Sequence, residues 1–366
     1  MFSYLANRLL CFRKSLLHFI LQMSDFFSHL GNFVIQRLSS SSGNPTDLEA
    51  NVPCGIPEDS MCRIRTTNLQ PQHELDLLGV GASGQVYNVS EQVVLKSCRT
   101  FVPPSSDAPE IEHWDYASDT LFHFNLMENE RTVLQQLQKR PHPHIIEAID
   151  TEQPEGLYLR KYRQIPDEVK TNPARRIRLY HDIADALRHL HSLGIVHDDV
   201  RIDNVLVDDR DSAILCDFSA ASPCGDSNLV FPHLPLPIGG PSPILSEETD
   251  MFAFASFMFK MEVGSAPEFS FESGKVSLPE LNSGNESIDK IIRTAWLGNY
   301  DHTSDVVQDL ASMDSQVNNG PQSSDLLPTP EYLKRQVMDW RKCREDKFGM
   351  MILYTKLDDQ NGTLPS

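Results

Sequence analysis

The chain has 366 residues, of which 40% are hydrophobic, so it can bury a substantial core in one large domain and still carry an extension at each end. Its formal net charge of −19 argues against a nucleic-acid partner, because a phosphate backbone would be repelled and no run of Lys and Arg compensates locally. The seven cysteines are scattered without a Cys-x-x-Cys pair, which argues against a disulfide framework or a zinc site and favours an intracellular protein, cytoplasmic or nuclear.

Residues 1–38 are rich in Phe and Leu and carry basic residues against a lone acid, Asp25. The pattern predicts an amphipathic helix that charged residues interrupt before an apolar run long enough to span a membrane can form. Three interpretations stay open: a helix packed on a protein surface, a mitochondrial targeting segment, and a membrane-surface anchor. Residues 39–62, which begin with four serines, predict a flexible linker.

A glycine-rich stretch, Gly79-Val80-Gly81-Ala82-Ser83-Gly84, comes next. In a dinucleotide-binding fold the third glycine opens a helix. Here alternating β-branched and polar residues follow as far as Leu95 and predict two strands, so the glycines cap a hairpin. Such a lid lets backbone amides come close to phosphates, and Lys96 on the following strand can reach them as a point charge.

Residues 100–109 carry three prolines and predict a surface loop inserted before the segment that contains Glu130. Further on, apolar residues recur at helical spacing from Ile177 to Leu190, Pro173 suits a first turn and Gly194 suits a stop, so we expect a helix over 173–193.

The most informative residues lie in Ile195–Leu206 and in Cys216-Asp217-Phe218. Phosphoryl transfer needs an acid that takes the proton of the acceptor hydroxyl, and oxygen ligands that hold the metal ions which neutralise growing charge. Asp199 fits the first role, while the amide of Asn204 and the carboxylate of Asp217 fit the second.

Taken together, these motifs resemble those of the protein kinase family, in the family's order and from about residue 75 to about residue 310. The resemblance implies an α+β, bilobal fold in a domain over 63–315, with a small, mainly β lobe over 63–162 and a larger, mainly helical lobe over 163–315. Residues 316–366 form a C-terminal extension, in which 332–344 predict a helix. It also implies ATP and Mg²⁺ as cofactors and a protein substrate.

The resemblance assigns roles residue by residue. Catalytic roles fall on Asp199, Arg201, Lys96 and Glu130, and metal binding on Asn204 and Asp217. Nucleotide binding falls on Gly79, Val80, Gly81, Ala82, Ser83, Gly84, Val86 and Lys96. His197 and Phe218 are expected to be packing residues, and Asp250 resembles the buried aspartate that braces the catalytic loop.

The chain departs from the family pattern at four places. Asp198 stands where an arginine usually pairs with an activation-loop phosphate, Arg201 replaces a lysine, and Ser219 replaces the glycine after Asp217-Phe218 and should stiffen that turn. No Ala-Pro-Glu motif precedes Asp250, and the late arginine that pairs with its glutamate is absent from residues 296–303.

Three functional hypotheses follow. The leading one is an ATP-dependent kinase acting on Ser or Thr of a protein. The second, motivated by Asp198, Ser219 and the absent Ala-Pro-Glu, is a pseudokinase that acts as a scaffold. The third is a small-molecule kinase of the aminoglycoside or choline type, which lacks the usual peptide platform. The sequence does not identify the substrate or the regulator.

Overall fold

The computed structural model describes residues 65–68, 72, 74–81, 83–227, 235–236, 240–241, 244–272, 275–314, 328–349 and 356–359. All of them belong to the compact unit Arg63–Ser366. The amphipathic helix predicted in 1–38, the linker 39–62 and the lid residue Ala82 lie outside the described residues.

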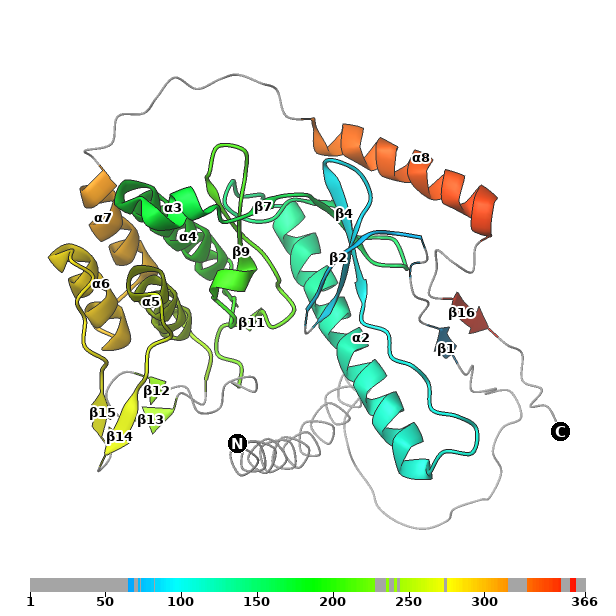
Figure 1. Cartoon of the computed structure of the whole chain (residues 1–366), viewed down its shortest axis with the longest axis horizontal. Coiled ribbons are helices and arrows are strands. Elements are labelled where there is room, and N and C mark those ends of the chain that lie inside the picture. The colour runs from blue at the N-terminus through cyan, green and yellow to red at the C-terminus, as the bar shows by residue number, and fades with distance from the viewer. Residues whose placement is uncertain are drawn as a thin grey trace, which may run out of the picture. The chain divides into compact units, whose positions relative to one another are not determined.

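The small lobe is built on an antiparallel sheet of five strands in the order β2-β3-β4-β6-β5 (Figure 1). The two strands predicted between Gln85 and Leu95 are confirmed as β3 and the first half of β4. The bounds are β2 (Leu77–Val80), β3 (Gly84–Asn88), β4 (Val93–Cys98), β5 (Ala148–Asp150) and β6 (Leu157–Arg160).

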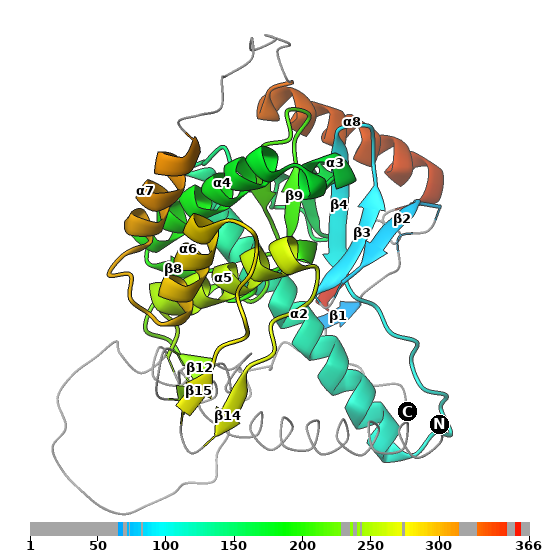
Figure 2. The same cartoon turned by 60° about the vertical axis from the view of Figure 1, so that its left-hand side comes forward.

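Every residue of β4 is buried, and its side chains alternate between two hydrophobic clusters, as successive strand residues must. Val94 and Cys98 join the main core with α2 (Glu110–Gln138), whereas Val93 and Leu95 join a second cluster with α8 (Pro330–Phe348). One helix therefore packs against each face of the sheet (Figure 2).

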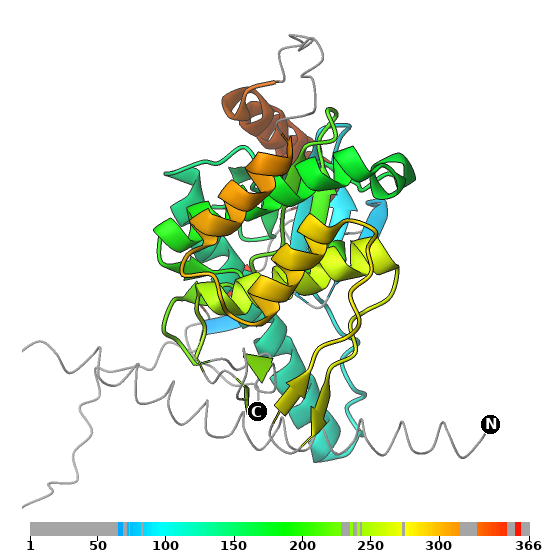
Figure 3. The ribbon, with the colours of Figure 1, turned by 90° about the vertical axis from the view of Figure 1, so that its left-hand side faces the viewer.

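The large lobe is mainly helical, and its helices pack on one another around the main core (Figure 3). The predicted helix over 173–193 is confirmed as α4: the Asn172 side chain caps its start, and Gly194 follows its end with φ +71°. The helices are α3 (Asp167–Thr171), α4 (Pro173–Ser192), α5 (Glu247–Val263), α6 (Glu286–Trp296) and α7 (Thr303–Asp314).

Short strands frame the segments that carry the predicted catalytic residues. A three-stranded sheet has the order β10-β9-β7, and β8 pairs with β11. These strands are β7 (Arg163–Gln164), β8 (Ile195–Val196), β9 (Val205–Val207), β10 (Ala213–Leu215) and β11 (Ser222–Pro223). Three further antiparallel pairs join β1 (Arg65–Asn68) to β16 (Lys356–Asp359), β12 (Pro235–Leu236) to β13 (Gly240–Pro241), and β14 (Ser270–Glu272) to β15 (Lys275–Ser277).

This arrangement confirms the α+β, bilobal fold that the resemblance implied. The proline-bearing segment 100–109 is irregular, as predicted. Helix α2, however, has 29 residues, and its buried residues all lie between Met127 and Leu137, whereas Ile111, Trp114 and Leu121 in its first half are exposed. No helix in the described part of the chain is both long and apolar enough to cross a membrane.

The predicted C-terminal helix is confirmed as α8, and its packing on the small-lobe sheet is a contact that the sequence did not predict (Figure 1). Leu333 and Val337 are buried against Tyr87, Leu95 and Tyr158. Because the sheet is covered on this face too, α8 contributes to the hydrophobic core of the small lobe.

Polar contacts fix α8 in place beside these apolar ones. The guanidinium of Arg341 binds the buried carboxylate of Glu155, which also accepts a hydrogen bond from the Tyr158 hydroxyl at 2.7 Å. The Lys334 ammonium lies 3.6 Å from the buried carboxylate of Asp150. Helix α8 therefore supplies a cation to each of two buried carboxylates, and Asp150 also accepts hydrogen bonds from the N–H of Glu152 at 3.0 Å and the amide of Gln153 at 2.7 Å.

We expect Leu333→Ala to lower the free energy of unfolding by about 2–4 kcal/mol, because it removes a fully buried side chain and leaves a cavity under α8. Met338→Ala is the matched control, since Met338 lies on the same helix and is 54% exposed, and we expect it to change stability by less than about 0.5 kcal/mol. Urea unfolding of both variants checks the difference, and equal losses would contradict the packing of Leu333.

Candidate functional site

Lys96 meets Glu130, its predicted partner, and Asp217, a predicted metal ligand. The Lys96 ammonium on β4 lies 2.6 Å from Glu130 Oε2 on α2 and 3.0 Å from Asp217 Oδ1 in the large lobe. Burial opposes the charge of Lys96, but the two carboxylates outweigh it and raise the pKa of the lysine. Lys96 is therefore charged at neutral pH and connects the two lobes.

Asp217 lies in a tight turn that several groups hold. Its φ is +64°, a left-handed conformation that aspartate tolerates better than most residues. Its Oδ1 accepts hydrogen bonds from the Ser219 hydroxyl at 2.7 Å and, more weakly, from the Ser83 hydroxyl of the lid at 3.4 Å. Although burial opposes it, the Lys96 charge together with the Ser219 bond lowers the pKa of Asp217 to about 2.

A second contact ties this turn to the helix that carries Glu130. The Asn129 amide donates to the carbonyl oxygens of Ser219 at 3.0 Å and Ala221 at 2.9 Å. Sequence reasoning missed Asn129, because no periodicity or motif separates it from other polar residues of the helix. The Ser219 hydroxyl adds a bond within the turn that glycine would lack, and the stiffening of the turn stays a prediction.

The catalytic loop is braced by Asp250 on α5, as predicted. Asp250 is fully buried, and its carboxylate accepts hydrogen bonds from the backbone N–H of His197 at 2.7 Å and of Asp198 at 2.9 Å. The same carboxylate lies 2.9 Å from His191 Nε2. Burial opposes its charge, but the His191 bond and the backbone donors lower the pKa of Asp250, so it stays ionised as an acceptor.

Within the loop, Asn204 orients Asp199. The Asn204 Nδ2 donates to Asp199 Oδ2 at 2.7 Å and to the Asp199 carbonyl oxygen at 2.9 Å. Its side-chain oxygen is therefore the atom that can serve as a metal ligand. The backbone oxygen of Asn204 accepts from Cys216 N at 2.9 Å, which places Asn204 beside the segment that leads into Asp217.

Burial raises the pKa of Asp199 above its usual value, an effect that the Asn204 bond and the Arg201 charge partly offset. A carboxylate with a raised pKa is the better proton acceptor. Arg201 itself pairs with Asp203, at 2.8 Å from its Nη2, and both side chains are more than half exposed. The structure thus places Arg201 on the same loop as Asp199 but gives it Asp203 as its ion-pair partner.

The predicted lid is the β2–β3 hairpin, and its residues differ in burial. Gly79 and Val80 are exposed on β2, Ser83 is fully buried, and Val86 packs against the main core. The N–H of Gly81 donates to the carbonyl of Gly84 at 2.8 Å and closes the turn. Gly84 lies so close to β4 that a Cβ there would come within 2.5 Å of the Ser97 carbonyl oxygen.

Asp198, the first departure from the family pattern, points toward other acids. It has φ +60° and is only 6% exposed. Burial, followed by the charges of Asp250 and Asp199, raises the pKa of Asp198 to about 8. The side chain is therefore mainly protonated at neutral pH, which removes the like-charge repulsion that three neighbouring carboxylates would otherwise cause.

Polar contacts also connect the starts of α5 and α7, near the region where the Ala-Pro-Glu motif is missing. Glu247, at the start of α5, accepts hydrogen bonds from the backbone N–H and the hydroxyl of Thr303, both at 3.0 Å, and lies 3.8 Å from His191 Nδ1. Neutral donors thus connect the starts of α5 and α7 at this point.

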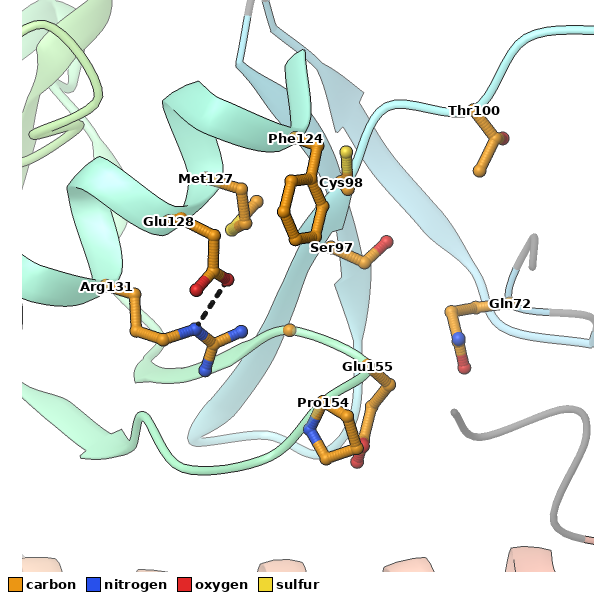
Figure 4. A pocket seen from close by; sticks show the side chains of 11 residues that line it. Gln72, Ser97, Cys98, Thr100, Phe124, Met127, Glu128, Arg131, Pro154 and Glu155 are labelled. Carbon is orange, nitrogen blue, oxygen red and sulfur yellow. Dashed lines mark hydrogen bonds and ion pairs between the residues drawn. The ribbon is translucent and has the colours of Figure 1, made fainter. Parts of the chain in front are cut away.

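Two cavities accompany these residues. A small one lies between β4, α2 and the turn before β6, beside the Arg131–Glu128 ion pair at 2.9 Å (Figure 4). None of the predicted phosphate-binding residues lines it. A larger one, of about 300 Å³, lies between the catalytic loop and α5 and includes Asp199 in its wall.

Comparison with known proteins gives a consistent picture. Residues 72–313 match the family model described as a protein kinase domain. The chain is similar to the serine/threonine-protein kinase ppk6 of Schizosaccharomyces pombe, with 26% identity over 300 residues that cover 74% of this chain and 36% of ppk6. It is also similar to the serine/threonine-protein kinase PrkC of Bacillus subtilis, with 22% identity over 231 residues. A third similar protein is the dual specificity protein kinase pyk3 of Dictyostelium discoideum, with 24% identity over 144 residues.

The alignments with PrkC and pyk3 cover 58% and 35% of this chain, and 33% and 11% of those relatives. The chain thus spans about a third or less of the length of the three relatives named.

We expect Gly84→Ala to lower the free energy of unfolding by about 1–3 kcal/mol, because the added methyl group would overlap the β4 backbone. Gly79→Ala is the control, since a Cβ at Gly79 meets no atom within 4 Å. Thermal unfolding of the two variants measures the difference, and the same melting temperature for both would show that Gly84 does not pack as described.

The raised pKa of Asp198 predicts a pH-dependent stability. Between about pH 4 and pH 8 the folded protein keeps a proton that the unfolded chain has released, so this group makes the wild type less stable as the pH rises. Asp198→Asn cannot ionise, so we expect it to exceed the wild type by roughly 1–3 kcal/mol at pH 8, with a smaller difference toward pH 4.

Chemical unfolding at a series of pH values checks this expectation. Asp209→Asn is the control, because the Asp209 side chain is 84% exposed. Parallel curves for Asp198→Asn and the wild type would contradict a buried, protonated Asp198.

Proposed function

Since the chain belongs to the protein kinase family, we propose that it transfers the terminal phosphoryl group of ATP to a serine or threonine hydroxyl of a protein substrate. The observation that carries this proposal is the arrangement of two sets of groups. In the first set, the Lys96 ammonium lies 3.0 Å from Asp217 Oδ1. In the second set, the Asn204 side chain donates to the Asp199 carboxylate at 2.7 Å, and Asn204 lies next to the segment that leads to Asp217.

In this proposal Asp199 is the base. Its carboxylate accepts the proton of the acceptor hydroxyl, and the Asn204 amide keeps that carboxylate in one orientation. The N–H of Asp199, 3.3 Å from His197 Nδ1, adds a second restraint on the loop. Fixing the base in this way lowers the cost of orienting it in the transition state.

Lys96 and the lid bind the phosphates. The lysine is held charged by Glu130 and Asp217, and a glycine-rich lid lets backbone N–H groups come close to phosphates. The side-chain oxygen of Asn204 and the carboxylate of Asp217 suit a hard divalent cation, for which we propose Mg²⁺, and such a cation neutralises charge on phosphate oxygens when bound. Arg201, on the loop of the base, supplies a further positive charge near the acceptor.

The preference for serine and threonine is supported by the names of two similar proteins, ppk6 and PrkC, both described as serine/threonine-protein kinases. A dual specificity kinase, pyk3, is also similar, so tyrosine belongs among the acceptors to be tested. The match to a protein kinase domain over 72–313 favours a protein acceptor over a small molecule.

A second candidate function, a nucleotide-binding scaffold without phosphoryl transfer, has its own support. The Oδ1 of Asp217 already has Lys96, Ser83 and Ser219 as donors. Metal binding at Asp217 has to compete with these contacts, and Ser219 is a donor that the usual glycine lacks.

The experiment that separates the two functions measures transfer and nucleotide binding in the same preparation. We expect the wild-type protein to label generic acceptor proteins with γ-labelled ATP and Mg²⁺. Asp199→Asn should reduce that rate by a factor of about 10²–10⁴, because the proton acceptor is lost, while keeping the rise in melting temperature that Mg-ATP causes.

Asp209→Asn is the matched control, because it removes a carboxylate that is exposed in the turn between β9 and β10, and we expect wild-type labelling from it. Labelling by Asp199→Asn at the wild-type rate would remove the proposed base. A thermal shift with Mg-ATP in the absence of any labelling by the wild type would favour the scaffold.

A further inference from the structure

The larger cavity gives information about the substrate that the phosphoryl-transfer groups do not. Asp199 and Val200 of the catalytic loop line it, together with one face of α5 and with Ala266 and Pro267 beyond that helix. With a volume of about 300 Å³, it is large enough for more than one side chain. The residue that we propose as the base, Asp199, is part of its lining.

The wall formed by α5 is mainly apolar and rigid. Phe252, Ala253, Ser256 and Phe257 line it, and the two phenylalanines are 2% and 3% exposed. Residues spaced in this way lie on one side of a helix, so the wall runs along the helix axis away from the catalytic loop. Because α5 is bound to the loop through Asp250, the wall and the base keep a fixed relation to each other.

Lys260 stands at the far end of this wall. It is exposed and lines the cavity, and no carboxylate of the described residues lies within 4 Å of its ammonium. The other cation of the cavity, Arg201, already pairs with Asp203. A lysine in the last turn also suits the helix dipole, but that role does not require the side chain to line a cavity beside the base.

The distance from the base to this cation can be estimated from helix geometry. Lys260 follows Asp250 by ten residues of α5, which at 1.5 Å per residue is roughly 15 Å along the helix axis. Long side chains lean toward the helix N-terminus. Measured along the helix axis, the ammonium is therefore roughly 10 Å from Asp250, the residue that binds the catalytic loop. An extended peptide covers that distance with about three residues.

We propose that this cavity binds the part of a protein substrate next to its acceptor residue, and that Lys260 selects an acidic side chain about three residues away from the acceptor. The proposal rests on the proposed kinase function and names its substrate class: acidic segments with an apolar residue between the acid and the acceptor. The apolar residue contacts Phe252 and Phe257, and the carboxylate pairs with the ammonium of Lys260.

The electrostatics of the loop are compatible with an acidic segment. Asp198 also lines the cavity, and burial raises its pKa to about 8, so it is mainly uncharged at neutral pH. The negative charge that faces the substrate is then that of Asp199, while Lys260 supplies positive charge and the charge of Arg201 is paired with that of Asp203.

The test uses the full chain and a peptide library with a central Ser or Thr, in which every flanking position is scanned with Asp, Glu, Lys, Arg and Leu. We expect the wild type to prefer Asp or Glu at one position two to four residues from the acceptor. Lys260→Glu should raise the KM of the best acidic peptide roughly five- to tenfold with kcat little changed, because an exposed ion pair is replaced by repulsion. Lys260→Arg should keep the preference.

Lys290→Glu is the matched control, since Lys290 is an exposed lysine on α6 that does not line the cavity, and we expect it to keep the wild-type preference. A preference that is the same in Lys260→Glu and the wild type, or a basic preference in the wild type, would overturn the selection by Lys260 while leaving the kinase function intact. Failure of the wild type to label any peptide or protein would overturn the kinase function and this proposal together.

Discussion

The ammonium of Lys96 lies between the carboxylates of Glu130 and Asp217, and the arrangement of the two lobes depends on this buried group of charges. An unpaired charge in such a place would cost several kcal/mol, so each member requires the others. Glu130 comes from α2, Lys96 from the sheet, and Asp217 from the large lobe. Any movement that separates one of them from the rest leaves a buried charge without its partner. The position of α2 and the conformation of the Asp217 turn therefore depend on each other. The hydrogen bonds from Asn129 to the carbonyl oxygens of Ser219 and Ala221 also join α2 to the Asp217 turn.

Asp250 has the corresponding role inside the large lobe. Its buried carboxylate accepts two backbone N–H groups and faces His191. These bonds fix the direction in which the chain enters the catalytic loop, where Asp198 has φ +60°. An arginine side chain at position 198 would add a cation above Asp250, whereas the aspartate adds an acid that burial keeps protonated. An aspartate at position 198 supplies no cation with which a phosphorylated loop could pair.

Local patterns in the sequence were sufficient to predict the β3 and β4 strands and the ends of α4, because each depends on a turn or a cap within a few residues. The pairing of Glu130 with Lys96 followed from the resemblance to the protein kinase family. Local patterns did not predict that α8 packs on the sheet, because Leu333 and Val337 form an ordinary apolar stripe whose target lies far away in the sequence. They also did not predict the length of α2: its first half exposes Ile111, Trp114 and Leu121, and therefore lacks the buried, periodic face from which a helix is recognised. The Ser83 contact with Asp217 depends on how the lid folds over β4, which no local rule determines.

Strand β4 connects these observations. One face presents Val94, Lys96 and Cys98 to α2 and the large lobe, and the other presents Val93 and Leu95 to α8. A strand whose two faces are both packed cannot shift its register or tilt without opening one of the two clusters. The position of the Lys96 ammonium is therefore set partly by residues 330–348, which lie beyond the segment that matches the protein kinase domain. In this chain a helix outside the family match acts as part of the support for the lysine, because it covers the outer face of the sheet with apolar contacts and adds cations to the carboxylates of Asp150 and Glu155.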